Sequence, residues 1–475
     1  MFKEKSLKKN FVEGPLFFKI FTYAAPIMLT SILQIVYNMA DNIVVGQFSG
    51  DPLALAAVGC TGSLTGLIVN LLIGISGGTG VIVAQAYGAK NHDMVSRAVH
   101  TSVGFALVGG LVFMIFGLLI SRPALIWMGT KEDLLDLATL YMRIVCLGIP
   151  ASSLYNFSAA GLRSVGDSKT PLAILSASGL MNVLLNVVFV VLFGMSVDGV
   201  ALATIISQYT SAIWVLLVLI RRKNECYNLN LRKIRIEGAV LARVLRFGIP
   251  AALQGTMFNI SNTLITSAAN GFSNAALSAK TIVGSIDGIC YCALNSYFHA
   301  AMTVTAQNYG ARKRDRIDRA FIFSLLQVTT IGILLGQLVL LFSNPLASLF
   351  IDPADPNKDA VLMHCTELLN VLLQTYFLCG VMETLSGWLR GLGYSLMPTL
   401  VSVAGICGVR ILWIYVFFPM FPTIMGLYYC YPISWGSTAL IFFVMCFIAH
   451  RRLKRDFSDN DEIVKSEKNV DAVAS

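Results

Sequence analysis

The sequence carries few charges. Only 13% of its 475 residues are Asp, Glu, Lys or Arg, whereas 56% are apolar. Soluble domains carry roughly a quarter charged residues. Together with a mean hydropathy of +0.71, this composition argues against a string of soluble domains and indicates a chain that lies mostly in lipid.

The residue groupings of catalytic and metal sites are also missing. Ten cysteines are scattered without metal or redox spacing, and His100 and His299 stand alone. The stretch GISGGTG lacks the Gly-Lys-Ser/Thr ending of a phosphate loop, so close helix packing through Gly74 and Gly78 is the better interpretation. We therefore predict no enzyme, no ATP-driven pump and no cofactor.

Long apolar segments make up most of the chain. Each is long enough to span a bilayer as a helix, and none alternates as barrel strands do. The first is too long for the core of a signal peptide and has no cleavage site close behind it. We predict about twelve spans, at 17–45, 53–83, 95–120, 134–158, 171–194, 199–220, 246–270, 276–305, 320–343, 361–386, 396–418 and 424–449.

Basic residues are concentrated in alternate loops. Of 35 Lys and Arg residues, 29 fall in the set that includes both termini, four fall in the other set, and Arg143 and Arg410 lie within spans. Positive charge marks the cytoplasmic side. We expect cytoplasmic termini, contact with anionic lipid rather than nucleic acid, and a multi-pass location in a membrane.

One motif occurs twice. AQAYGAKNHDMVSRAV begins at Ala84 and AQNYGARKRDRIDRAF begins at Ala306, with eight of sixteen positions identical. Weaker sequence similarity relates the segment near Pro26 to the segment near Pro250. A third pair of similar segments aligns Arg163 with Arg390. A repeat unit of six spans enters the membrane twice from the same side, so the copies are parallel.

The repeat predicts an all-α membrane protein of two six-helix bundles related by a pseudo-two-fold axis. We expect a cytoplasmic segment at 1–16, lobes at 17–220 and 246–450, a linker at 221–245 and a disordered tail at 451–475. Two such lobes suit transport by alternating access, although duplication could also build only a larger bundle.

Several motifs together resemble one known family. They are Q-x-x-Y-N-x-x-D-x-x-x-V-G from Gln34, the two AQ-x-YGA copies, and GLR-x-x-GD-x-x-x-P from Gly161. The sequence resembles the multidrug and toxic compound extrusion (MATE) family over about residues 15–450, and its bacterial members more than the eukaryotic ones, which implies the plasma membrane of a bacterium. The resemblance implies a twelve-helix, two-lobe antiporter that exports organic, often cationic, compounds in exchange for H⁺ or Na⁺.

Asp41 is the first candidate for ion coupling, because a carboxylate within a span is costly and functional by default. It shares a helix face with Gln34, Tyr37 and Asn38. The family's cation site, as the resemblance implies, would use Asp41, Asn182 and Thr204, with a carboxylate where this chain has Asn186. Losing that carboxylate weakens a Na⁺ site and favours protonation of Asp41. The alternatives are a satisfied interhelical hydrogen bond or a position at the outer end of the span.

The second half carries different acids. A face of the eighth span presents a counter-charge and aromatic surface for an organic cation, and Glu383 lies in the tenth span. The predicted substrate-binding residues are Asp287, Tyr291, Asn295, Phe298 and Glu383. An ion pair with Arg410, or a position nearer the headgroups, is the structural alternative.

Pro26 and Pro250 lie inside the first spans of the two halves, where each can kink its helix and shift the neighbouring side chains. The expected partners are small organic cations and the bilayer, and we expect a monomer to suffice. A flippase for lipid-linked oligosaccharides is the competing function. Its anionic cargo would favour a cleft lined with Arg or Lys.

Overall fold

The computed structural model describes residues 10–51, 53–351 and 356–474; the first nine residues of the expected segment 1–16, and Ser475, lie outside them. The described part is helical and contains no strand, as predicted. It divides into two compact units. Unit 1 comprises Thr22–Tyr87 and Asn91–Thr256, and unit 2 comprises Phe11–Phe21, Gly88–Lys90 and the chain from Met257 onward.

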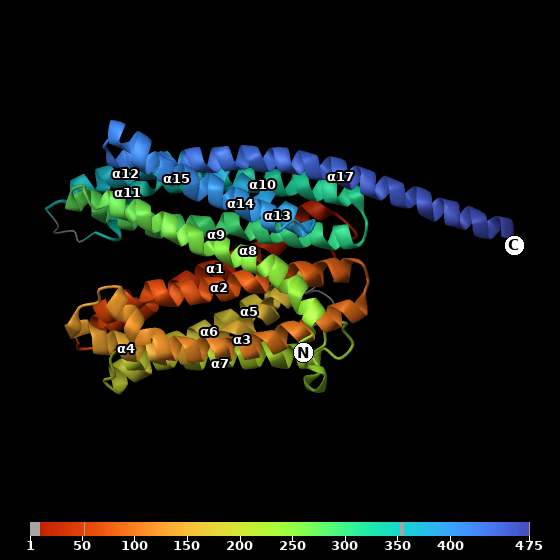
Figure 1. Cartoon of the computed structure of the whole chain (residues 1–475). Coiled ribbons are helices and arrows are strands. Elements are labelled where there is room, and N and C mark those ends of the chain that lie inside the picture. The colour runs from red at the N-terminus through yellow and green to blue at the C-terminus, as the bar shows by residue number, and fades with distance from the viewer. Residues whose placement is uncertain (1–9, 52, 352–355, 475) are drawn as a thin grey trace. The chain divides into compact units, whose positions relative to one another are not determined.

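Unit 1 is a helical bundle (Figure 1). Besides most of α1 (Leu16–Phe48) and the start of α8 (Gly238–Ala269), it contains α2 (Ala54–Gly88), α3 (His92–Trp127), α4 (Glu132–Leu147), α5 (Ile149–Ser164), α6 (Lys169–Asn186), η2 (Val187–Leu192), α7 (Val197–Arg221) and η3 (Leu231–Lys233). The division falls inside α1 and α8, whereas the sequence places the lobe boundaries at residues 17 and 246. Each of these two helices therefore contributes residues to both units.

Unit 2 repeats this order with more interruptions (Figure 1). Its elements after α8 are α9 (Asn274–Gly310), α10 (Arg314–Leu341), α11 (Ser343–Ser348), α12 (Lys358–Gln374), α13 (Tyr376–Gly391), α14 (Leu396–Ser402), η4 (Val403–Gly408), α15 (Val409–Leu412), η5 (Trp413–Phe417), η6 (Phe418–Met420), α16 (Ile424–Tyr428) and α17 (Cys430–Ala474).

Among the described residues, nine helices are long and apolar enough to cross a membrane, or 11 when each of two bent helix pairs counts as one span. The bent pairs are α4 with α5 and α12 with α13. The seventh predicted segment, 246–270, forms α8 but is not among the 11. Its second half carries amides and hydroxyls at positions such as Asn259, Asn262 and Thr266, which lower its hydropathy.

The backbone confirms the repeat at unusual positions. Lys90 and Arg312 occupy corresponding places in the two motif copies, and they are the two non-glycine residues of the described chain with positive φ, at 56° and 53°. In the next repeated motif, Gly166 and Gly393 adopt φ of 89° and 103°. Left-handed backbone is rare outside glycine, so its recurrence at matching positions indicates that the two halves share one loop design.

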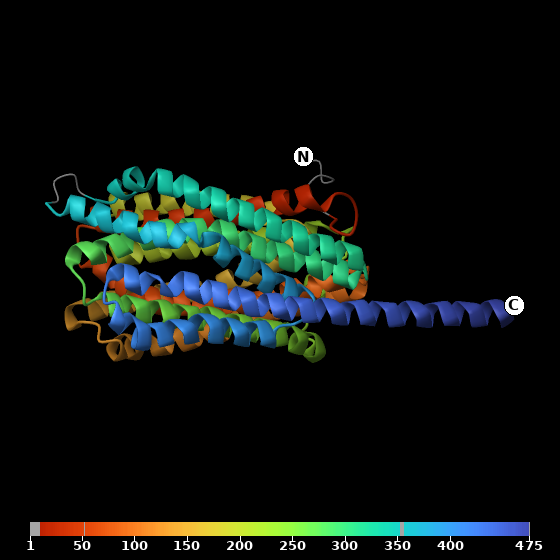
Figure 2. The same cartoon turned by 90° about the horizontal axis from the view of Figure 1, so that it is seen from above.

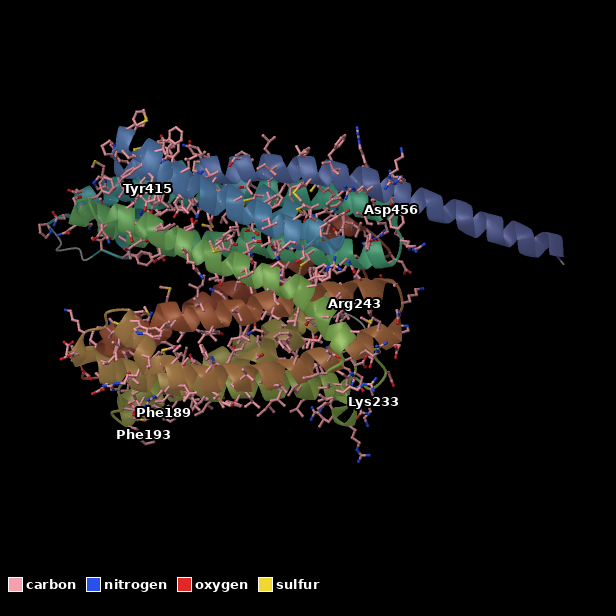
Figure 3. All side chains as sticks on the ribbon, in the orientation of Figure 1. Phe189, Phe193, Lys233, Arg243, Tyr415 and Asp456 are labelled. Atoms are coloured by element: carbon pink, nitrogen blue, oxygen red, sulfur yellow. The ribbon has the colours of Figure 1, made fainter. Side chains whose placement is uncertain are left out.

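Both halves also contain π-helical turns. η2 follows Asn186 directly, and η5 occupies the equivalent part of the second half. At the end of η2, the rings of Phe189 and Phe193 stack with centroids 6.3 Å apart (Figure 3). Insertions of this kind are frequent at functional sites and are not recognisable from apolar periodicity.

The glycines of α2 allow close contact with α8, as predicted. A Cβ atom built on Gly78 would meet the Val244 carbonyl, and one on Gly74 would meet the backbone of Ala252. Gly248 of α8 in turn faces the backbone of Ile75. These contacts join the two helices beside Pro250, which lies inside a continuous α8 as Pro26 lies inside a continuous α1.

The disorder expected at 451–475 stays a prediction, although the backbone up to Ala474 is described as a helix. α17 continues as a helix to Ala474 and extends past the other helices of its unit (Figure 2). Residues 451–474 contain no proline or glycine, so nothing in the sequence ends the helix that the last span begins.

Candidate functional site

The Asp41 carboxylate lies where α1, α6 and α7 meet inside unit 1. The Asn186 side-chain N–H donates to Asp41 Oδ1 at 2.5 Å, and the Thr204 hydroxyl lies 3.5 Å from Oδ2. The same hydroxyl is 3.0 Å from the Val200 carbonyl, so it has two acceptors within reach. Three helices thus place their polar groups around one carboxylate.

Asn182 extends this arrangement by one residue. Its side-chain N–H lies 3.4 Å from the Thr204 oxygen, and both Asn182 and Asn186 are buried. A buried apolar cluster of unit 1 includes Val45 on α1, Val200 on α7 and Val190 on η2, which follows α6 directly. The site therefore combines one ionisable group with amides and a hydroxyl in apolar surroundings.

Asn186 also carries an orphaned acceptor. Its Oδ1 atom is buried and has no hydrogen-bond partner among the described residues. Amide oxygen and nitrogen exchange places when the amide group turns by 180°. The residue can therefore present either a donor or an acceptor to Asp41.

The other predicted members of the α1 stripe lie apart from the carboxylate. Tyr37 donates to the Ser176 carbonyl at 3.1 Å, and its ring fills the space beside Gly179, so it joins α1 to α6. Gln34 and Asn38 are exposed. The structure thus gathers Asp41, Asn182, Asn186 and Thr204, and leaves these two amides outside the cluster.

In unit 2, Asp287 pairs with a residue that the sequence analysis missed. The Tyr376 hydroxyl donates to Asp287 Oδ1 at 2.6 Å. Tyr376 also packs edge-to-face against Trp435, with ring centroids 5.7 Å apart. Asp287 and Tyr376 are 89 residues apart, and no spacing rule connects them.

A second cluster surrounds Glu383, which is buried. Tyr291 donates to Glu383 at 3.3 Å and accepts from the Asn295 amide at 3.3 Å. Phe298 lies further along the same helix beneath the Arg390 guanidinium, 5.5 Å from the ring centroid. The predicted substrate residues therefore form two groups in one unit: Asp287 with Tyr376, and Tyr291, Asn295 and Glu383 together.

Arg410 does not form the direct salt bridge that the structural alternative requires. It donates to Asn262 at 2.9 Å and to Ser434 at 3.3 Å, and it lies 4.4 Å from the Tyr431 ring centroid. Asp287 and Glu383 each accept a hydrogen bond from a tyrosine hydroxyl.

Known proteins match most of the chain. The family model MatE matches residues 26–188 and 250–416, two blocks that reproduce the repeat. "Probable multidrug resistance protein YoeA" of Bacillus subtilis is 29% identical over 395 residues, which cover 82% of this chain and 84% of that protein. "Probable multidrug resistance protein NorM" of Thermotoga maritima is 24% identical, with 82% of each chain covered.

Solved structures agree with this result. A MATE protein in complex with MaL6 superposes with a TM-score of 0.87 at 21% identity, covering 94% of this chain and 98% of that one. A MATE family transporter of the MOP superfamily in an outward-facing conformation superposes with a TM-score of 0.86 at 21% identity over the same shares. These likenesses confirm the two-lobe, twelve-helix fold. The chain belongs to the MatE family, a family of multi-pass membrane transporters rather than enzymes.

Proposed function

We propose that this protein is a secondary active efflux antiporter that exports organic cations in exchange for H⁺. Relatives over most of its length are named for multidrug resistance, which supports drug-like substrates. The observation that carries the proposal is the Asp41 cluster, because it places one ionisable group among adaptable neutral partners.

Asn186 suits a carboxylate that gains and loses a proton. When Asp41 is ionised, the amide N–H donates to it, as the structure shows. When Asp41 is protonated, its O–H needs an acceptor. The orphaned Oδ1 of Asn186 supplies one after the amide turns. Both protonation states are then hydrogen-bonded, which lowers the cost of keeping either state buried.

The same groups are less suited to Na⁺. A hard cation takes several oxygen ligands, and carboxylates are its strongest protein partners. Here Asp41 is the single carboxylate of the cluster, and Asn186 directs its N–H at it. A sodium site would need the amide to turn and Thr204 to give up one of its acceptors.

The acids of unit 2 supply the counter-charge for the exported cation. Asp287 lies beside Tyr376 and Trp435, and Glu383 beside Tyr291. Aromatic rings and a carboxylate together attract organic cations. The competing flippase would need free basic groups, but Arg410 is already bound to Asn262 and Ser434.

Uptake of a fluorescent cation into proteoliposomes, with H⁺ and Na⁺ gradients imposed separately, tests this proposal. We expect a proton gradient to drive uptake and a sodium gradient at constant pH to have no effect. Uptake that follows only the sodium gradient would overturn proton coupling. Uptake that follows neither gradient would overturn antiport.

A further inference from the structure

A basic groove of about 430 Å³ lies at one end of unit 1, between the first turns of α3 and the linker before α8. Its lining includes Arg97 and His100 from α3 and Arg232, Lys233 and Arg235 from the linker. Lys233 lies at the same end of the unit as Arg243 in the first turns of α8 (Figure 3). The groove is separate from the Asp41 cluster.

The linker is held firmly against α3. His100 accepts the backbone N–H of Asn230 at 3.0 Å through Nε2, while its Nδ1 lies 2.7 Å from the Ser96 carbonyl. Gly104 has no side chain, so Ile234 and Ile236 approach the helix closely. The groove is therefore preformed and does not depend on a ligand for its shape.

Two of its arginines are already neutralised. Glu237 lies 2.5 Å from Arg97 Nη2 and 2.9 Å from Arg235 Nη2. Hydrogen bonds from Arg97, and then from Arg235, hold the pKa of Glu237 below its ordinary value, so Glu237 is anionic at neutral pH. Asp93 lies 3.6 Å from Arg97 and adds a second negative charge.

Arg232 and Lys233 are the basic residues of the groove lining that the Glu237 and Asp93 ion pairs do not involve. Both are exposed, and neither has an acidic partner within ion-pair distance among the described residues. Both line the same groove from the turn of η3, so their cationic heads can reach one anion bound there. An arginine beside a lysine suits a phosphate, which accepts several charge-assisted hydrogen bonds.

Apolar side chains flank these charges. The linker reads Leu-Arg-Lys-Ile-Arg-Ile from Leu231, and Leu231 and Ile236 remain 62% and 42% exposed. Exposed aliphatic residues interleaved with basic ones are typical of segments that lie in the headgroup region of a bilayer. A soluble anion would leave this aliphatic surface in water.

We propose that this groove is a binding site for the phosphate headgroup of an anionic phospholipid. Arg232 and Lys233 donate to the phosphate oxygens, and Leu231 packs against the start of the acyl chains. The Glu237 pairs fix the wall of the groove and prevent the other arginines from competing for the phosphate.

Equilibrium binding of phosphatidylglycerol and phosphatidylcholine to the purified full chain in mixed micelles tests the site. Each basic group near a headgroup is expected to raise the affinity for the lipid about fivefold. The double variant Arg232→Gln, Lys233→Gln should therefore bind phosphatidylglycerol roughly 25-fold more weakly. The change should leave phosphatidylcholine binding as it is. Lys223→Gln, on an exposed linker residue outside the groove, is the control and should bind like wild type.

A second pair of measurements separates a lipid from a soluble phosphate. Leu231→Gln should weaken phosphatidylglycerol binding several-fold and leave binding of inorganic phosphate unchanged. Because the altered side chains are exposed, the variants should unfold at the wild-type temperature. Arg232→Lys, which keeps the charge, should retain most of the lipid binding. Undiminished lipid binding by the double variant, or equal binding of inorganic phosphate and lipid with no effect of Leu231→Gln, would overturn the proposal.

Discussion

Asn186 stands where the family resemblance implies a carboxylate, and this one residue decides how Asp41 is partnered. As an amide it donates to Asp41 and keeps a free acceptor. A carboxylate there would bring two negative charges together. Such a pair either shares a proton or binds a metal cation.

We therefore predict that Asn186→Asp gives the protein a sodium response. Two carboxylates and the Thr204 oxygen form a better site for a hard cation than one carboxylate does. A sodium gradient at constant pH should then drive uptake of a fluorescent cation into proteoliposomes, which it does not drive in the wild-type protein. Asn182→Asp, one helical turn earlier, serves as the comparison. If Asn186→Asp remains responsive to protons alone, the amide does not determine ion choice.

Asp287→Asn should weaken binding of cationic compounds roughly tenfold, and binding of neutral compounds little, because it removes a counter-charge beside aromatic rings. Binding to the purified protein can be measured for a matched cationic and neutral pair. Tyr376→Phe removes the hydrogen bond but keeps the charge, and Asp359→Asn removes an exposed acid elsewhere in the unit. Equal losses for both compounds would assign Asp287 a structural role.

For single residues, the sequence predicts those site members that share a helix face or a family motif. Asp41, Asn182, Asn186 and Thr204 were predicted together, and the structure brings them together. Tyr376 could not be predicted, since its contact with Asp287 depends on how α13 packs on α9. Helical periodicity predicts that Gln34 shares a face with Asp41, but periodicity does not show where neighbouring helices cease to cover α1.

At the scale of elements, apolar length predicted the helices well and their interruptions poorly. The breaks at Gly148 and Thr375 and the π-turns η2 and η5 leave hydropathy unchanged, so a window of apolar residues passes over them. The repeat supplies part of the missing signal, because the break at Gly148 has a counterpart at Thr375 and η2 has a counterpart in η5.

The contact between α2 and α8 allows a matched test of helix packing. Gly78→Ala should destabilise the protein by about 1–3 kcal/mol, because its Cβ would meet the Val244 carbonyl. Gly77→Ala, whose Cβ would meet nothing within 4 Å, should be neutral or stabilising by up to about 1 kcal/mol. Thermal unfolding in detergent compares the two. Equal midpoints would show that α2 and α8 do not pack as closely as described.

At the scale of the whole molecule, the distribution of basic residues predicts how the chain is inserted. The 29 to 4 division of Lys and Arg between the two sets of loops should place both termini in the cytoplasm. In a variant without the ten native cysteines, a cysteine at Ser475 should react with an impermeant maleimide only after the cells are opened. Labelling of intact cells at this position would contradict the orientation.

Antiport requires that the ion and the substrate favour different states of one conformational equilibrium. The exchange is therefore reversible. An outward flow of substrate should drive protons inward even when no proton gradient is imposed. The Asp41 cluster is the described group best suited to carry the proton. Asp41→Asn keeps the size of the side chain and one acceptor but cannot ionise. Asp51→Asn, beyond the end of α1, removes an acid from the same part of unit 1 and serves as the control.

The most direct measurement is the internal pH of proteoliposomes, followed with a trapped dye while a preloaded cationic substrate is allowed to leave. As the substrate leaves, we predict that the interior acidifies in the wild-type protein and in Asp51→Asn. We predict no coupled pH change in Asp41→Asn, although this variant should remain folded and still bind substrate. A wild-type pH response in Asp41→Asn would contradict the central claim and would move the coupling site to Asp287 or Glu383.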